Sequence, residues 1–197
     1  MRVFVATKNA GKLRELHALF AGSGWRLQAY PAYVEPEEGA TSYADNAALK
    51  ARTLRAQLAA AGVDAAVLGD DSGIEVTALG DRPGVLSARY GGENASWRER
   101  RNTLLAELAA SGSDDRSARF VCVLHFIDGT GREFSARGEV EGRLAAAERG
   151  SAGFSFDPIF EHPPAGKTFA ELSEDEKNAV SHRARAARTL LDAGRPT

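Results

Sequence analysis

Several residues able to bind a phosphorylated ligand gather in the segment Thr7-Lys8-Asn9-Ala10-Gly11-Lys12. The segment follows an apolar run and precedes leucines at helical spacing, which predicts a strand, a polar turn and a helix. The amino end of a helix presents unpaired backbone N–H groups and a partial positive charge, so it suits a phosphate, and Lys12 adds a mobile cation. An ordinary strand–helix turn with surface lysines is the alternative. A P-loop is excluded because Ala6 and Leu13 stand where that motif requires glycine and a hydroxyl residue.

Two pairs of acidic residues indicate a second kind of chemistry. Glu37-Glu38 precedes a turn, and Asp70-Asp71 is expected at the end of a buried strand, followed by Ser72. Magnesium binds carboxylate oxygens and usually keeps water and substrate phosphates as its other ligands, so carboxylates from two segments could hold it. For Glu37-Glu38 alone a solvated acidic turn is the simpler interpretation. Adjacent carboxylates at Asp70-Asp71 are unfavourable without a nearby cation.

A third group combines aromatic, acidic and basic residues: Phe154, Phe156, Asp157, Lys177, His182 and Arg183. A phenyl ring can stack on a nucleobase, with about 1–3 kcal/mol per base as the scale in nucleic-acid complexes. A carboxylate can accept from a ring N–H, and histidine or arginine can donate to a ring carbonyl. Core phenylalanines and a solvated helix end are the alternatives for these residues taken singly.

The elements that must position these residues follow from hydrophobic periodicity. Strands are predicted over Val3–Ala6, Arg26–Tyr30, Ala65–Gly69, Arg119–Ile127 and Glu133–Val140, the last two joined by a hairpin turn. After the segment 70–73, residues Ile74–Val76 are expected to continue extended. Helices are predicted after Lys12, from a cap at Thr41 or Ser42 to about Ala61, and over Trp97–Leu108. In the second helix Asn46 and Lys50 lie on one polar stripe at i, i+4. This mixture predicts an α/β fold with a mixed sheet.

The C-terminal segment contains a helical pattern that conflicts with its polar residues. Ser173 and Glu176 have capping-box spacing, and an apolar face follows from Val180 onward. On one continuous helix His182 would point about 200° away from Val180, so the polar residues would diverge. We therefore predict a break near Ser181, which would cap a second helix beginning at His182.

Composition narrows the class of protein. The 197 residues are 43% hydrophobic and 26% charged with a net charge of −2, which is typical of one globular domain or two closely packed lobes. The charge disfavours a protein that coats nucleic acid. The single cysteine, Cys122, lies in an apolar run and excludes an intrachain disulfide, which favours a reducing compartment. No stretch of about 18 apolar residues occurs, so we expect a cytoplasmic protein with no membrane span.

Taken together, the motifs resemble the inosine/xanthosine triphosphate pyrophosphatase family, which clears non-standard purine nucleotides. The matching segments occur in the family's order along nearly the whole chain: 6–16, 37–39, 45–47 with 50–51, 70–74, 83–84, 87–90, 153–160, 167–168, 170–172, 176–178 and 181–183. The resemblance implies a single domain over 1–197, with an elongated mixed β-sheet flanked by helices and two lobes with a cleft between them. It also implies a homodimer.

The resemblance implies hydrolysis of ITP, dITP and XTP to the nucleoside monophosphate and pyrophosphate, with Mg²⁺ as cofactor. The partners are then small-molecule nucleoside triphosphates, with no nucleic acid and no membrane. A related pyrophosphatase acting on pyrimidine or modified nucleotides is one alternative. A nucleotide-binding module without catalysis is another, and the acidic pairs and lysines argue against it.

Roles are carried over onto the matching residues. Triphosphate contacts are expected from Thr7, Lys8, Asn9, Ala10, Gly11, Lys12, Lys50 and Lys177. Glu37 or Glu38 and Asp71 resemble the metal ligands, and Asp71 also resembles the base for the attacking water. Ser72 resembles a substrate contact, and the base is expected to meet Phe154, Ser155, Phe156, Asp157, His182 and Arg183. The family usually has Gly and Tyr at Ser155 and Phe156, so a tyrosine hydroxyl is lost here.

Overall fold

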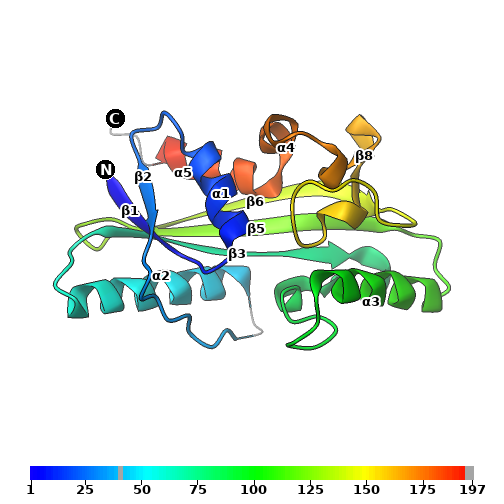
Figure 1. The fold of residues 1–197 in the computed structure, drawn as a ribbon, viewed down its shortest axis with the longest axis horizontal. Helices are drawn as coiled ribbons and strands as arrows, with labels where there is room; N and C mark the ends of the chain where they lie inside the picture. Colours follow the sequence, from blue (N-terminus) through cyan, green and yellow to red (C-terminus); the bar gives the residue numbers. More distant parts are fainter. Residues whose placement is uncertain (40–41, 194–197) are drawn as a thin grey trace. The chain divides into compact units, whose positions relative to one another are not determined.

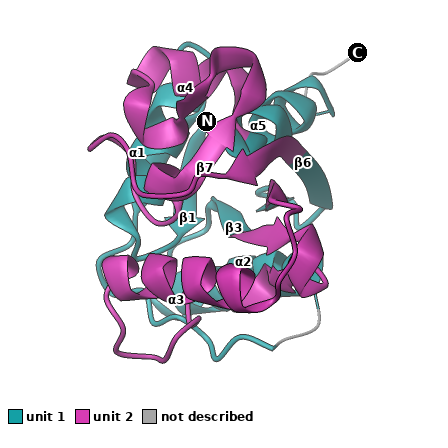
Figure 2. Ribbon diagram, turned by 90° about the vertical axis from the view of Figure 1, so that its right-hand side faces the viewer, with its two compact units in different colours: residues 1–71, 122–138, 182–197 teal, residues 72–121, 139–181 magenta. Residues whose placement is uncertain are grey.

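The computed structural model describes residues 1–39 and 42–193, which divide into two compact units. Unit 1 comprises the described residues 1–39, 42–71, 122–138 and 182–193, and unit 2 comprises 72–121 and 139–181 (Figure 2). Three long strands, β3 (Ala66–Val76), β5 (Ser117–Ile127) and β6 (Glu133–Leu144), contribute residues to both units. Within the described residues seven strands follow the order β2-β1-β3-β5-β6-β7-β8, and an eighth, β4, pairs with β3. This confirms the predicted α/β class with a mixed sheet.

Unit 1 is a sheet covered by helices on both faces (Figure 1). Strand β1 (Arg2–Ala6) pairs in parallel with β2 (Arg26–Ala29) and with β3. Alternate residues of β1 enter two separate cores, because successive side chains of a strand point to opposite faces. Val3 and Val5 pack with α1 (Ala10–Leu19) and α5 (His182–Ala193), whereas Phe4 and Ala6 pack with α2 (Tyr43–Ala60).

Unit 2 surrounds a separate aromatic core that includes Phe120, Phe156, Phe160 and Phe169. Its helices are α3 (Trp97–Ala110) and α4 (Glu174–Val180), and its short strands are β4 (Arg82–Pro83), β7 (Phe160–His162) and β8 (Lys167–Thr168). Single 3-10 turns complete it: η1 (Thr77–Leu79), η2 (Gly84–Leu86), η3 (Asp157–Ile159), η4 (Pro163–Ala165) and η5 (Phe169–Glu171).

The predicted end of the third strand at Gly69 is wrong. Strand β3 continues without interruption to Val76, so Asp70-Asp71 lies inside a strand. The parallel pairing with β1 does end at Gly69, which is the partner of Ala6. The two aspartates therefore lie on β3 just beyond the point where β1 ends. There, charged side chains of neighbouring helices reach them. These cationic partners compensate the cost of burying two carboxylates in the strand.

The helix break near Ser181 is confirmed. Helix α4 ends at Val180, Ser181 has an extended backbone (φ −66°, ψ 157°), and α5 begins at His182. Capping of α5 by the Ser181 hydroxyl stays a prediction. The capping box of Ser173 with Glu176 is present.

Two further expectations are met, and one lies outside the described residues. Ser42 caps α2, its hydroxyl accepting from the backbone N–H of Asp45 at 3.0 Å, while the alternative cap, Thr41, is among the residues not described. Cys122 is buried, as its apolar run predicted, and its thiol donates to Asp70 Oδ2 at 3.6 Å. Across the described part of the chain, every helix is too short or too polar to traverse a lipid bilayer.

Candidate functional site

The turn between β1 and α1 is built as a helix cap. The Asn9 side-chain oxygen accepts from the backbone N–H groups of Gly11 at 2.9 Å and Lys12 at 3.1 Å. The Thr7 hydroxyl accepts from the backbone N–H of Asn9 at 3.1 Å. Lys8 and Ala10 are exposed. The predicted segment thus stands at a strand–helix junction, and its capping bonds orient the start of α1.

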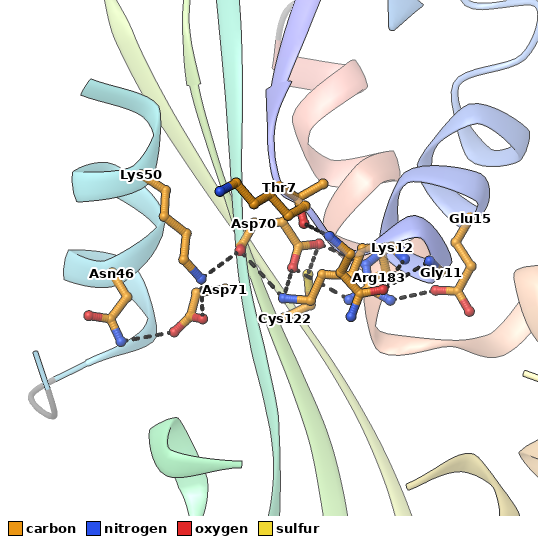
Figure 3. A network of polar contacts seen from close by, with 12 residues as sticks. Thr7, Gly11, Lys12, Glu15, Asn46, Lys50, Asp70, Asp71, Cys122 and Arg183 are labelled. Atoms are coloured by element: carbon orange, nitrogen blue, oxygen red, sulfur yellow. Dashed lines mark hydrogen bonds and ion pairs between the residues drawn. The ribbon is translucent and has the colours of Figure 1, made fainter. Parts of the chain in front are cut away.

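Lys12 belongs to a buried network of charges on the α1 and α5 side of β3 (Figure 3). Its ammonium lies 2.7 Å from Asp70 Oδ1, and Arg183 Nε lies 2.7 Å from Asp70 Oδ2. Arg183 also pairs with Glu15, and the Arg183 side chain is 1% exposed. Burial alone would raise the pKa of Asp70, but the positive charges of Arg183 and Lys12 outweigh it and hold that pKa well below its usual range. Asp70 is therefore a permanent counter-ion that fixes Lys12.

Asp71 points to the other side of β3, toward α2. The Lys50 ammonium lies 2.9 Å from Asp71 Oδ1 and 2.6 Å from Glu38 Oε1, and it donates to the Asp70 carbonyl at 3.3 Å. The Asn46 side-chain N–H donates to Asp71 Oδ2 at 3.1 Å (Figure 3). Asn46 and Lys50 are one helical turn apart, so both reach the same carboxylate. The structure thus brings Lys50, Asp71 and Glu38 into one cluster.

Burial decides the electrostatics of this cluster. It raises the pKa of Asp71, and the neighbouring Lys50 and Lys12 offset this shift only in part. Burial by itself would lower the pKa of Lys50, but Asp71 and Glu38 reverse that effect and raise it. Lys50 therefore stays protonated at neutral pH, whereas Asp71 is a stronger base than an exposed aspartate.

The donor set fits a divalent cation completed by substrate. Glu38 and Asp71 come from separate segments and flank one positive charge, the Lys50 ammonium. Within residues 1–39 and 42–193 no three His, Cys, Asp or Glu side chains converge as a full metal site. Magnesium is commonly bound by only one or two carboxylates together with phosphates and water. Of the two glutamates, Glu38 is the one in contact with this cluster, whereas Glu37 is exposed.

Unit 2 brings together two of the residues expected to meet the base, Phe154 and Asp157, and one expected to contact the triphosphate, Lys177. Lys177 Nζ lies 2.5 Å from Asp157 Oδ2 and 5.0 Å from the centre of the Phe154 ring. The Phe154 backbone N–H donates to the same carboxylate oxygen at 2.7 Å. A side chain at Gly153 would bring its Cβ to 2.2 Å from that oxygen, so glycine is required there.

The remaining predicted residues are placed differently. Phe156 is fully buried and packs edge-on against Trp97 at 5.6 Å, which matches the core alternative for that ring. Ser155 has a left-handed backbone (φ 59°), and Ser72 is partly exposed on β3. His182 is buried at the start of α5. Base contacts by these residues and by Arg183 stay predictions.

Sequence reasoning left two members of the charged clusters without a role. Asn46 was placed on the same polar stripe as Lys50, and the structure shows that it donates to the same carboxylate, that of Asp71. Glu15 pairs with Arg183, which is 168 positions away in the sequence, and no local pattern predicts such a pair.

Comparisons with known proteins agree with these motifs. A family model described as the Ham1 family matches residues 3–193. A dITP/XTP pyrophosphatase of Thermus thermophilus is 46% identical, covering 98% of this chain and 91% of the relative. One of Exiguobacterium sibiricum is 40% identical, covering 96% and 95%. The structure of a HAM1 protein from Coxiella burnetii matches with a TM-score of 0.84 and 34% identity, covering 98% of each chain.

Proposed function

This chain belongs to the Ham1 family, and from that premise we propose that it hydrolyses non-standard purine nucleoside triphosphates (ITP, dITP and XTP) to the nucleoside monophosphate and pyrophosphate. Such a reaction removes these nucleotides from the cellular pool. Two relatives covering nearly the whole chain carry the name dITP/XTP pyrophosphatase. The observation that carries the proposal is the convergence of Glu38 and Asp71 on Lys50, because carboxylates and a phosphate-binding cation then share one cluster.

In the proposed reaction a water oxygen bonds to the α-phosphorus, and the bond from that phosphorus to the bridging oxygen breaks. Asp71 orients the water and accepts its proton, and its raised pKa suits that task. Lys12, Lys50 and Lys177 donate to phosphate oxygens, assisted by Thr7 and Asn9. Glu38 and Asp71 are the residues that would hold Mg²⁺, which would neutralise phosphate charge and lower the pKa of a water molecule beside it.

Selectivity is proposed to rest on hydrogen-bond polarity at the base. Hypoxanthine and xanthine present a carbonyl acceptor at position 6, where adenine presents an amino donor. Donors from His182 and Arg183 would satisfy the carbonyl and leave unpaired groups against adenine, a mismatch that can discriminate strongly. Since Arg183 pairs with Asp70 and Glu15, reading a base requires it to exchange one of these contacts. Phe154 would stack on the ring and Asp157 would accept from its N–H.

The proposal is tested by pyrophosphate release from ITP, dITP, XTP, GTP, ATP, dTTP and UTP, with and without Mg²⁺. We expect turnover of the first three only with the metal, and a rate that rises toward alkaline pH. Preference for UTP or dTTP would favour the related pyrimidine pyrophosphatases. Binding of ITP without release would identify a non-catalytic module, and equal turnover by wild type and Asp71→Asn would overturn the assigned site.

We also propose that residues 1–197 act as one catalytic domain in a cytoplasmic homodimer. Resemblance to the family supports this assembly. Light scattering on the purified protein would measure its mass against the 21.0 kDa of a single chain. A monomer at working concentration would contradict the dimer without affecting the proposed reaction.

A further inference from the structure

Tyr33 carries a buried hydroxyl that the proposed reaction does not yet use. Its ring belongs to the core between α2 and β1, with Phe4, Ala51 and Leu54, and the residue is 2% exposed. Within residues 1–39 and 42–193 the hydroxyl has no hydrogen-bond partner. Nearly all buried polar groups in folded proteins have one, so a buried hydroxyl without a partner requires an explanation.

The electrostatic surroundings of the Tyr33 hydroxyl connect it to the catalytic cluster. Burial is the largest cause of its raised pKa, and the charges that act on it next are those of Glu35, Lys50 and Glu38. The hydroxyl therefore stays protonated at neutral pH and acts as a donor. Its ring shares a core with Ala51, the residue next to Lys50 on α2, and Lys50 pairs with Glu38 at 2.6 Å.

Lys50 cannot bind a phosphate without giving up a present contact. An ammonium group has three protons, and Lys50 already reaches Glu38 Oε1 at 2.6 Å, Asp71 Oδ1 at 2.9 Å and the Asp70 carbonyl at 3.3 Å. Glu38 is the partner that best tolerates the exchange, because its side chain is 23% exposed against 6% for Asp71. Arrival of a triphosphate should therefore turn Lys50 away from Glu38.

We propose that Tyr33 is a positioning residue whose hydroxyl donates to the Glu38 carboxylate when Lys50 turns from Glu38 to the triphosphate. The inference rests on the proposed function, because it needs a phosphorylated substrate at Lys50. Glu38 is the acceptor rather than Glu35, since Glu35 is exposed to water and contacts the backbone N–H of Lys8 at 3.4 Å. The hydroxyl thus keeps Glu38 aimed at the cluster after its ion pair opens.

The first test compares Tyr33→Phe with wild type in free and ligand-bound states. In the free protein the midpoint of thermal unfolding should not fall, because the hydroxyl makes no bond there. With Mg²⁺ present, affinity for the α,β-imido analogue of ITP should drop about 10-fold, the scale of one hydrogen bond to a charged group. Tyr30→Phe is the matched control, since Tyr30 lies in the same segment, is only half-buried and packs its ring on Phe4. It should change neither quantity.

A second measurement locates the new hydrogen bond. The chain has four tyrosines, so the ¹³Cζ resonance of Tyr33 in labelled protein is assigned by its loss in Tyr33→Phe. Adding the imido analogue with Mg²⁺ should shift this resonance in wild type and in Glu35→Gln, and shift it much less in Glu38→Gln.

Several outcomes would overturn the inference. Unchanged affinity in Tyr33→Phe, a fall in the stability of the free protein without a change in affinity, or a resonance shift that depends on Glu35 would each do so. If the wild-type protein releases pyrophosphate from ITP but Tyr33→Phe binds the imido analogue with unchanged affinity, the inference alone is refuted. Wild-type protein that does not turn over ITP refutes the proposed function instead.

Discussion

Asp70 and Asp71 are adjacent and chemically identical, yet they have opposite electrostatic roles. Strand alternation directs Asp70 to the α1 and α5 side of β3, where Arg183 and Lys12 lower its pKa. Asp71 faces α2, where burial raises its pKa and Lys50 offsets this only in part. One carboxylate is thus locked in its charged form as a counter-ion, and the other is kept basic. The two carboxylates therefore differ in role: Asp70 holds two cations in place, and Asp71 has the raised pKa that the proposed proton acceptor requires.

The largest effect on catalysis is expected from replacing Asp71. Asp71→Asn should lower kcat for ITP by roughly 10³-fold, the scale of general base catalysis, because the amide cannot accept the proton of water. Steady-state release of pyrophosphate measures it. Thermal stability should remain near that of wild type, since Asn46 and Lys50 keep hydrogen-bonding partners. A variant that is unfolded would instead mean that Asp71 is structural.

The matching change on the other side should act mainly on stability. Asp70→Asn leaves Arg183 short of a buried counter-charge, so the free energy of unfolding should fall by about 3 kcal/mol. Urea denaturation followed by circular dichroism measures the loss. If the folded fraction of Asp70→Asn has lost as much kcat as Asp71→Asn, the division of roles is wrong.

The free energy of unfolding should depend on acidic pH in opposite directions for the two carboxylates. The pKa of Asp70 is lowered in the folded state, so it contributes stability that is present above its unfolded value of 3.8 and is lost as the pH falls below it. The pKa of Asp71 is raised, so ionising it in the folded state costs stability above that value and the cost disappears on acidification. Unfolding free energies measured at a series of acidic pH values should therefore fall less steeply in Asp70→Asn and more steeply in Asp71→Asn than in wild type.

The smallest expected effect concerns Asn46. Asn46→Ala removes one hydrogen bond to Asp71, worth about 1–1.5 kcal/mol, so kcat should fall about 5- to 10-fold while KM changes little. Initial rates over a range of ITP concentrations separate the two constants. A change confined to KM would place Asn46 in substrate binding rather than in orientation of the base.

Much of the fold and part of the site were predictable from local pattern. Period-two apolar runs and helical spacing identified the main strands and helices, and the divergence of His182 from its neighbours identified the break at Ser181. These features depend on residues within one or two turns, so the sequence alone contains them. The resemblance to the family assigned Lys12, Lys50 and Asp71 to one site, and that assignment stays a prediction.

Only the tertiary structure decided which charges meet. Arg183 and Asp70 are 113 positions apart, and their pairing depends on α5 packing beside α1. Tertiary structure also determines that Glu38, rather than Glu37, contacts Lys50. It likewise determines that β3 continues through the two aspartates. A buried charge is stable only beside a partner delivered by another element, and such partners are set by packing rather than by neighbours in the chain.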